Sequence, residues 1–150
     1  MFVFVYGTLR KACKESRKML DFQVPDILEK LGSEKGLARL PGYQMWDLGS
    51  YPGIFPVPHK KDCGEHVIVG ELYFFEDEVT ERVLSVLDEY EGCHPLSALP
   101  HEYERVKEPV FSVEQEKYVT SWIYRLTAPP ASAGIISCGD YSIFLASKYQ

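Results

Sequence analysis

Residues 2–10 read FVFVYGTLR, a strand-forming run that stops at a turn. Phenylalanine and valine alternate from Phe2 to Val5, and both residue types are enriched in buried strands. The run breaks at Tyr6-Gly7-Thr8, where glycine lets the backbone approach a ligand closely and threonine adds a hydroxyl. We therefore expect a core strand followed by a loop. That loop either presents backbone N–H groups to an anion or simply turns the chain.

Composition bounds the class of protein. The 150 residues suit a single domain, and 45% hydrophobic residues can fill a sizeable core. The net charge of −6, with bases interleaved among acids, argues against a nucleic-acid partner, which requires a basic stripe. Neither a bilayer-spanning run of ~20 apolar residues nor a signal peptide is present, so we expect a cytoplasmic protein without a membrane partner. Four widely spaced cysteines indicate reduced thiols.

The remaining chain reads as strands with two helical insertions. Residues 11–36 are rich in charge and predict one short helix, or two helices broken at Pro25. Strands are expected as short segments within 36–58, as a longer strand over Glu65–Phe75, and as an antiparallel pair over 101–112 and 116–126. The tail is expected to form a short helix or turn that docks Tyr141 and Phe144. This order predicts an α+β fold around a small, largely antiparallel sheet or barrel.

The clearest helix is DEVTERVLSVLDEYEG, residues 77–92. Asp77 is expected to cap its start, and Gly92 is expected to end it. At about 100° per residue, one apolar face collects Val79, Val83, Val86, Leu87 and Tyr90. We expect this face to pack on the core.

Three acids, Asp88, Glu89 and Glu91, stand in the last turn of this helix, where the helix dipole disfavours an anion by roughly 0.3–1 kcal/mol. Residues that are unfavourable for their local structure, such as these acids, occur most often at functional sites. Glu91 lies nearest the core-facing side, whereas Asp88 and Glu89 are expected to point toward solvent. Burial and the dipole should raise the pKa of Glu91, which suits a general base. The alternative is a solvated acid beside a helix-ending glycine.

Five motifs follow one another along the chain: FVYGTLR at 4–10, DLGSYPGI at 47–54, VGELY at 69–73, LDEYEG at 87–92 and YER at 103–105. In this order they resemble the gamma-glutamylcyclotransferase-like family, in particular its gamma-glutamylamine cyclotransferase branch. The resemblance covers about residues 2–125, with GDY at 139–141 as a final element. It implies a small mixed, mainly antiparallel β-barrel with flanking helices and a pocket at one end.

The resemblance also implies an activity, intramolecular aminolysis. The α-amine of a γ-glutamyl amine or peptide attacks its own γ-carbonyl, closes 5-oxoproline and expels an amine. No metal, cofactor or covalent enzyme intermediate is required, and relatives suggest a monomer or weak dimer. A tethered nucleophile of this kind gains on the order of 7–11 kcal/mol from proximity. The partner implied is a small γ-glutamyl substrate.

Residue roles follow from the same resemblance. Glu91 would be the general acid/base, and the Tyr6-Gly7-Thr8-Leu9 loop would bind substrate largely through its backbone. Tyr6, Tyr103 and Tyr124 are expected to wall the pocket, although core packing is the commoner fate of tyrosine. Arg105 is the candidate cation to orient a substrate carboxylate, with pairing to an exposed acid as the alternative.

Rival interpretations are weaker. A polar hairpin tip explains His59, Asp62, Cys63 and His66, which lack metal-site spacing. Cys93 and His94 are adjacent, and adjacent side chains seldom face each other as a nucleophile and its base must. The main alternative is a catalytically silent small-molecule binding member of the same fold. Two long segments, 11–36 and 93–102, depart from the family pattern at the expected pocket rim, so the leaving amine stays open.

Overall fold

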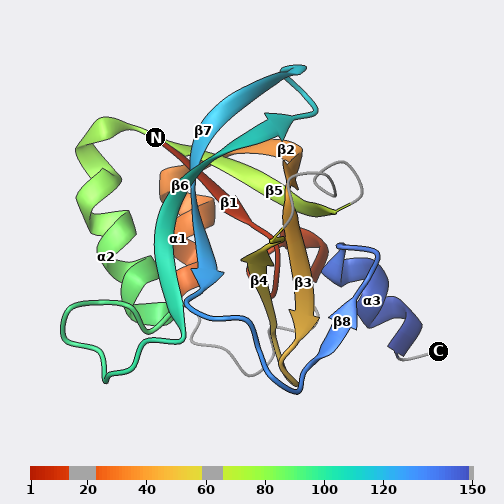
Figure 1. The fold of residues 1–150 in the computed structure, drawn as a ribbon. Helices are drawn as coiled ribbons and strands as arrows, with labels where there is room; N and C mark the ends of the chain where they lie inside the picture. The colour runs from red at the N-terminus through yellow and green to blue at the C-terminus, as the bar shows by residue number, and fades with distance from the viewer. Residues whose placement is uncertain (14–22, 59–65, 149–150) are drawn as a thin grey trace.

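The computed structural model describes residues 1–13, 23–58 and 66–148, and its centre is a closed five-stranded barrel (Figure 1). In spatial order the barrel strands are β1 (Phe2–Val5), β5 (Val67–Phe75), β2 (Gly32–Pro41), β6 (Tyr103–Ser112) and β7 (Lys117–Leu126). Neighbours run antiparallel except β1 and β7, which pair in parallel and close the barrel. The predicted α+β fold around a mixed, mainly antiparallel barrel is confirmed.

A second, three-stranded sheet lies beside the barrel, in the order β4, β3, β8. Its strands are β3 (Tyr43–Asp47), β4 (Pro52–Pro56) and β8 (Gly134–Ile136). The turn between β3 and β4 closes with a 3.0 Å hydrogen bond from Leu48 N to the Tyr51 carbonyl. The DLGSYPGI motif therefore forms a hairpin, which presents Tyr51 and Pro52 at a fixed place.

Strand β2 begins earlier than the sequence predicts. Residues 32–36 were expected in a helical stretch, but α1 (Gln23–Leu31) ends at Leu31 and β2 starts at Gly32. Gly32 pairs with Phe75 of β5, and a Cβ on Gly32 would lie 2.6 Å from the Leu28 carbonyl oxygen and 2.8 Å from the Phe75 ring. Only glycine allows this tight change from helix to strand, so pairing with a distant strand overrides the local charge pattern.

The main helix, α2 (Thr80–Tyr90), forms as expected with one difference at its start. A short 3-10 turn over Asp77–Val79 precedes it, and neither element has a side-chain cap, so the prediction that Asp77 caps the helix is wrong. Thr80 Oγ1 donates instead to the Glu76 carbonyl at 3.2 Å. Gly92 ends the helix with a φ of +74°, as predicted. In Figure 1, α1 and α2 lie on one side of the barrel and α3 (Tyr141–Lys148) on the other.

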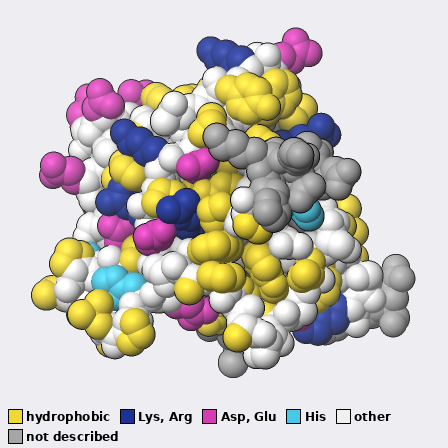
Figure 2. Space-filling view, viewed as in Figure 1, with side chains coloured by type: hydrophobic (Ala, Val, Ile, Leu, Met, Phe, Trp, Pro, Cys, Tyr) yellow, Lys and Arg dark blue, Asp and Glu magenta, His cyan; other side chains and the backbone are white. Residues whose placement is uncertain are grey.

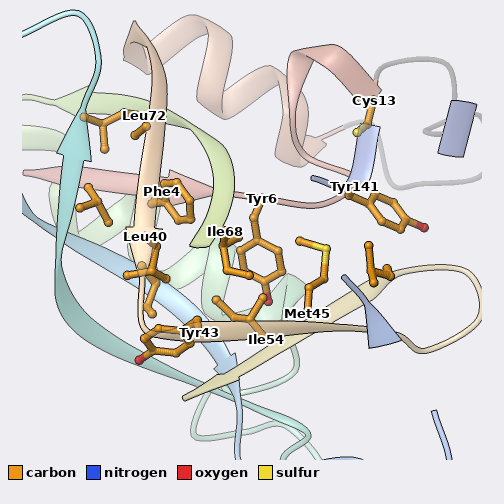
Figure 3. Close-up of a cluster of buried hydrophobic side chains, with 14 of the residues drawn as sticks. Phe4, Tyr6, Cys13, Leu40, Tyr43, Met45, Ile54, Ile68, Leu72 and Tyr141 are labelled. Carbon is orange, nitrogen blue, oxygen red and sulfur yellow. The ribbon is translucent and has the colours of Figure 1, made fainter. Parts of the chain in front are cut away.

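Strand β1 is buried on both faces, which explains its unbroken apolar sequence. Phe4 joins one cluster of buried side chains, drawn in Figure 3, which combines barrel residues such as Leu40 and Ile68 with Met45 and Ile54 of the second sheet. Val3 and Val5 point the other way, into a cluster with Val83 and Leu87 of α2. Because β1 is held on both sides, the loop that follows it starts from a fixed point.

The surface shows no segregation of charge on the face drawn in Figure 2, where Lys and Arg side chains are interspersed with Asp and Glu. Among the helices in the described part of the chain, none combines the length and apolar character that crossing a bilayer requires. The tail forms the expected short helix: Tyr141 is buried, and its ring stacks on Phe144 at 5.9 Å.

Candidate active site

A cavity of about 640 Å³ opens where β1 ends. Four segments contribute most of its wall: residues 3–9, the hairpin turn 49–52, the end of α2 with Glu91 and Gly92, and the start of β6 with Glu102 and Tyr103. Tyr124 of β7 and part of α3 complete it. The FVYGTLR, DLGSYPGI, LDEYEG and YER motifs, far apart in the sequence, thus meet at one cavity.

A buried ion network holds the loop after β1. Arg10 is 2% exposed, and its guanidinium donates from Nε to Glu71 Oε2 at 2.8 Å and from Nη1 to Asp140 Oδ1 at 2.9 Å. The other oxygen of Glu71 accepts the backbone N–H of Lys11 at 2.7 Å. Burial opposes ionisation of Asp140, but hydrogen bonds from Ser142 and the charge of Arg10 hold its pKa below the ordinary value.

Through this network, two motifs that do not form the main walls of the cavity have a structural role. Glu71 belongs to VGELY and Asp140 to GDY, and both fasten the residue that follows the Tyr6–Leu9 loop. Sequence reasoning missed this role. The available signal was a single acid, Glu71, inside the apolar strand VIVGELYFF, because a buried charge requires a partner.

Gly7 packs directly against the hairpin turn. A Cβ at this position would lie 2.9 Å from Pro52 Cγ, so a side chain there would push the loop and the turn apart. The carbonyl of Pro52 accepts a hydrogen bond from the Tyr103 hydroxyl at 2.8 Å. Position 7 therefore requires glycine because of this close contact, and not because of an unusual backbone angle.

The three predicted tyrosines all line the cavity, and their hydroxyl groups bind the protein itself. Tyr6 donates to the Tyr124 carbonyl at 2.7 Å, and Tyr124 donates to Asp88 Oδ1 at 2.7 Å. Burial, followed by the charge of Glu91, raises the pKa of Tyr6 well above its ordinary value. These phenols stay protonated and act as fixed, neutral walls.

Glu91 is the C-cap residue of α2 and lines the cavity. Its backbone N–H still donates to the Leu87 carbonyl at 2.9 Å, which fixes where the side chain leaves the helix. The side chain is partly buried, and its carboxylate has no hydrogen-bond partner within residues 1–13, 23–58 and 66–148. Burial raises the pKa of Glu91 to about 8, with a further contribution from the charge of Glu102.

The other two acids of the last turn separate. Glu89 is exposed, as expected, but the prediction that Asp88 points to solvent is wrong. Asp88 accepts hydrogen bonds from Arg105 Nε at 2.8 Å and Nη2 at 3.3 Å, in addition to the one from Tyr124. The pairing with Arg105 on strand β6 turns Asp88 inward. The prediction failed because helical position alone does not reveal a cation on a neighbouring strand.

Arg105 does not reach the cavity wall. Its guanidinium is held by Asp88 and lies 4.2 Å above the Trp122 ring, so its surroundings match the ion-pair alternative rather than a free carboxylate binder.

Lys148 of α3 is the basic residue within the described part of the chain that lines the cavity. The remaining predicted residues, Tyr6, Gly7, Thr8, Leu9, Glu91 and Tyr103, are brought together there.

The thiol alternative finds no support in the geometry. Burial raises the pKa of Cys93 to about 11, helped by the charges of Asp88 and Glu91. Cys93 Sγ donates to Asp88 Oδ1 at 3.9 Å, while His94 Nδ1 accepts the N–H of Leu96 at 3.1 Å, so the two side chains serve different partners. A protonated thiol is a weak nucleophile.

Across the described ranges, no group of three or more His, Cys, Asp and Glu side chains is arranged to hold a metal ion. Three members of the polar stretch considered above, His59, Asp62 and Cys63, lie outside the described residues.

The fold is thus a closed barrel with an acid-lined cavity at the end of its first strand. Comparison with known proteins identifies the family to which this barrel belongs. The family model described as "Gamma-glutamyl cyclotransferase, AIG2-like" matches residues 3–143. A protein of Vibrio cholerae serotype O1 named "Putative gamma-glutamylcyclotransferase" is 30% identical over 139 residues, 93% of each chain. The chain belongs to the gamma-glutamyl cyclotransferase, AIG2-like family, which confirms the resemblance drawn from the five motifs.

Solved structures share the fold. An AIG2-like protein from Mus musculus superimposes with a TM-score of 0.61 at 23% identity, covering 87% of this chain and 79% of that one. An uncharacterized protein from Pyrococcus horikoshii gives a TM-score of 0.59 at 18% identity, covering 99% and 96%. At these identities the likeness extends to the barrel architecture.

Proposed function

We propose that this protein is a cyclotransferase that converts a γ-glutamyl amine or γ-glutamyl peptide into 5-oxoproline and a free amine. One observation carries the proposal. Glu91 is a carboxylate with its pKa raised to about 8 and with no hydrogen-bond partner among the described residues, and it shares a cavity with the Tyr6–Leu9 loop. A proton acceptor in reach of a bound substrate is the main requirement of this chemistry.

Glu91 would act first as a base. It takes a proton from the α-ammonium of the substrate, and the freed amine nitrogen attacks the γ-carbonyl carbon to form the new C–N bond of a five-membered ring. The pKa of about 8 lies close to that of a free α-amino group, ~7.7–8.0, so the proton transfer is nearly balanced in energy.

Glu91 would then act as an acid. The protonated carboxyl returns its proton to the amide nitrogen, the bond from that nitrogen to the γ-carbon breaks, and the amine leaves while the carbonyl of 5-oxoproline re-forms. The ring nitrogen then loses the second proton of the former ammonium to Glu91, which is again a carboxylate, and Glu91 passes it to the departing amine, which leaves as an ammonium ion. Protons and charge therefore balance without water or a covalent enzyme intermediate. Acid/base help of this kind is typically worth about 10²–10⁴-fold in rate.

The Tyr6–Leu9 loop would hold the glutamyl half of the substrate. Backbone N–H groups around Gly7 are suited to a carboxylate or to the oxygen that gains charge as the ring closes. The Arg10–Glu71–Asp140 network supports this proposal because it fixes the loop before substrate arrives, and preorganised donors stabilise developing charge best.

For Arg105 we propose an indirect role. Its pairing with Asp88 positions the acceptor of the Tyr124 hydroxyl, and Tyr124 lines the cavity. In this account Arg105 shapes the wall rather than binding the substrate.

Product analysis tests the proposal. Purified protein is incubated with γ-glutamyl amines, γ-glutamyl amino acids and glutathione, and 5-oxoproline, free glutamate and free amine are quantified. Equimolar 5-oxoproline and amine without glutamate is the expected result. Glutamate in place of 5-oxoproline would indicate hydrolysis. Binding of these compounds without any product would favour the catalytically silent binding protein.

A further inference from the structure

A second acidic residue, Glu102, belongs to the cavity wall. It precedes β6 and lies between the LDEYEG and YER motifs, outside both. Glu102 is exposed, whereas Glu91 is partly buried, although both line the same cavity. An anion in this place meets whatever part of a substrate extends toward solvent.

The position of Glu102 is fixed at both its backbone and its side chain. The Tyr51 hydroxyl lies 3.0 Å from Oε2 and 3.2 Å from Oε1, and the Tyr51 ring packs against Tyr103 at 6.3 Å. The Glu102 carbonyl accepts the N–H of Thr127 at 2.9 Å, which ties it to the end of β7. Most exposed glutamates are free to turn away from a neighbouring charge, but this one is held in place.

The proposed chemistry directs the leaving group toward this carboxylate. Glu91 must reach both the attacking and the departing nitrogen, so the scissile amide lies beside the end of α2. In the proposed function the glutamyl half would be held at the Tyr6–Leu9 loop, and the rest of the substrate would extend toward the exposed part of the cavity wall, where Glu102 lies. The end of α2 and the start of β6 lie together in Figure 1, and both contribute to the cavity wall, to which α3 adds Lys148.

We propose, on the basis of the proposed function, that Glu102 held by Tyr51 selects the leaving group by charge. It favours γ-glutamyl amides whose leaving amine carries a second positive charge and disfavours those whose leaving amine carries a carboxylate. A fixed anion rejects a like charge as well as attracting an opposite one, and specificity needs both. The influence of Glu102 on the pKa of Glu91 is consistent with its closeness to the reacting atoms.

Three substrates of matched size test this selection: the γ-glutamyl amides of propylamine, of 1,3-diaminopropane and of β-alanine, which carry a neutral, a positive and a negative leaving group. From the strength of exposed ion pairs, kcat/KM for each charged substrate should differ from the neutral one by roughly 2- to 5-fold, in opposite directions. Raising ionic strength should shrink both differences.

Glu102→Gln should bring the three kcat/KM values together, and Tyr51→Phe should do so partly because it frees the carboxylate. The ratio between substrates is the readout, since loss of the Glu102 charge also lowers the pKa of Glu91 and moves all three rates together. Glu89→Gln is the matched control: it removes the same charge from the exposed face of α2, outside the cavity wall, and should keep the wild-type ratios.

The outcomes separate the two proposals. Product release with equal kcat/KM for the three substrates, or with ratios unchanged by Glu102→Gln, would overturn the charge selection and leave the cyclotransferase intact. A preference for the negative leaving group would overturn it as well. No 5-oxoproline from these three amides or from the γ-glutamyl amino acids and glutathione tested above would overturn the proposed function, and the selection with it.

Discussion

The guanidinium of Arg10 and the carboxylate of Glu71 form a 2.8 Å ion pair inside the protein, with side chains 3% and 6% exposed. Sixty-one positions separate the two residues, and the pair fastens the loop after β1 to the middle of β5. Because a buried charge is costly without its partner, this contact links the stability of the protein to the geometry of its cavity.

Glu71→Ala should therefore destabilise the protein by about 3–5 kcal/mol, because it leaves the Arg10 charge buried with one partner fewer. Denaturant unfolding monitored by circular dichroism measures the change. Glu34→Ala is the matched control: its 3.4 Å contact with Lys11 is exposed, so its loss should change stability by no more than about 1 kcal/mol. Equal effects of the two substitutions would show that the buried pair does not hold the loop.

Gly7→Ala should lower kcat/KM on the order of 10²-fold, because the new methyl group overlaps Pro52 and displaces the loop from the hairpin turn. Steady-state release of 5-oxoproline measures the change. Gly134→Ala introduces the same methyl group where nothing lies within 4 Å, and its activity should match that of the wild type. Full activity of Gly7→Ala would contradict the close contact assigned to Gly7.

Glu91 should make the stability of the protein depend on pH. Folding raises its pKa from 4.5 to about 8, so between these values the unfolded chain releases a proton that the folded protein retains. Stability contributed by Glu91 is therefore complete below pH 4.5 and falls as the pH rises to about 8. Glu91→Gln lacks this group, so its stability relative to the wild type should increase across that range.

Urea unfolding of both proteins at several pH values measures this difference. A constant difference between wild type and Glu91→Gln from pH 4.5 to 8 would mean that the carboxylate is well solvated in the folded protein. That result would contradict the electrostatic environment described for Glu91 without reference to any substrate.

Arg105→Ala distinguishes a wall-shaping residue from a substrate-binding one. Loss of the Asp88 pair and of the stacking on Trp122 should reduce stability by about 1–2 kcal/mol. KM should change by less than about 3-fold, since a bound substrate carboxylate would instead lose a charge-assisted hydrogen bond. Unfolding and steady-state kinetics on one preparation provide both numbers, and a KM raised more than about 10-fold would reinstate the direct contact.

The sequence predicts the parts of this fold that depend on neighbouring residues. FVFV specifies β1 because both faces of the strand are buried, and Gly92 ends α2 because only the backbone next to it matters. Glu91 stands out for a similar reason, since its distance from the apolar face is set by helical periodicity.

Contacts between segments that are far apart in the sequence could not be predicted from it. Asp88 turns inward because Arg105 approaches from β6, and β2 starts at Gly32 because β5 supplies its partner. Tyr51 and Glu102 meet across 51 positions, and no local pattern predicts such a meeting. Each of these cases concerns a charge or a strand whose partner lies on another element, whereas the wrong cap at Asp77 is a local error, because a 3-10 turn precedes the helix.

The central claim is that Glu91 transfers the proton during ring closure. Its most direct test compares 5-oxoproline release by wild type, Glu91→Gln and Glu89→Gln at one substrate concentration below KM. We predict a loss of about 10²–10⁴-fold for Glu91→Gln and wild-type release for Glu89→Gln, which changes the same charge two residues away on the exposed face. Undiminished release by a folded Glu91→Gln protein would contradict the claim.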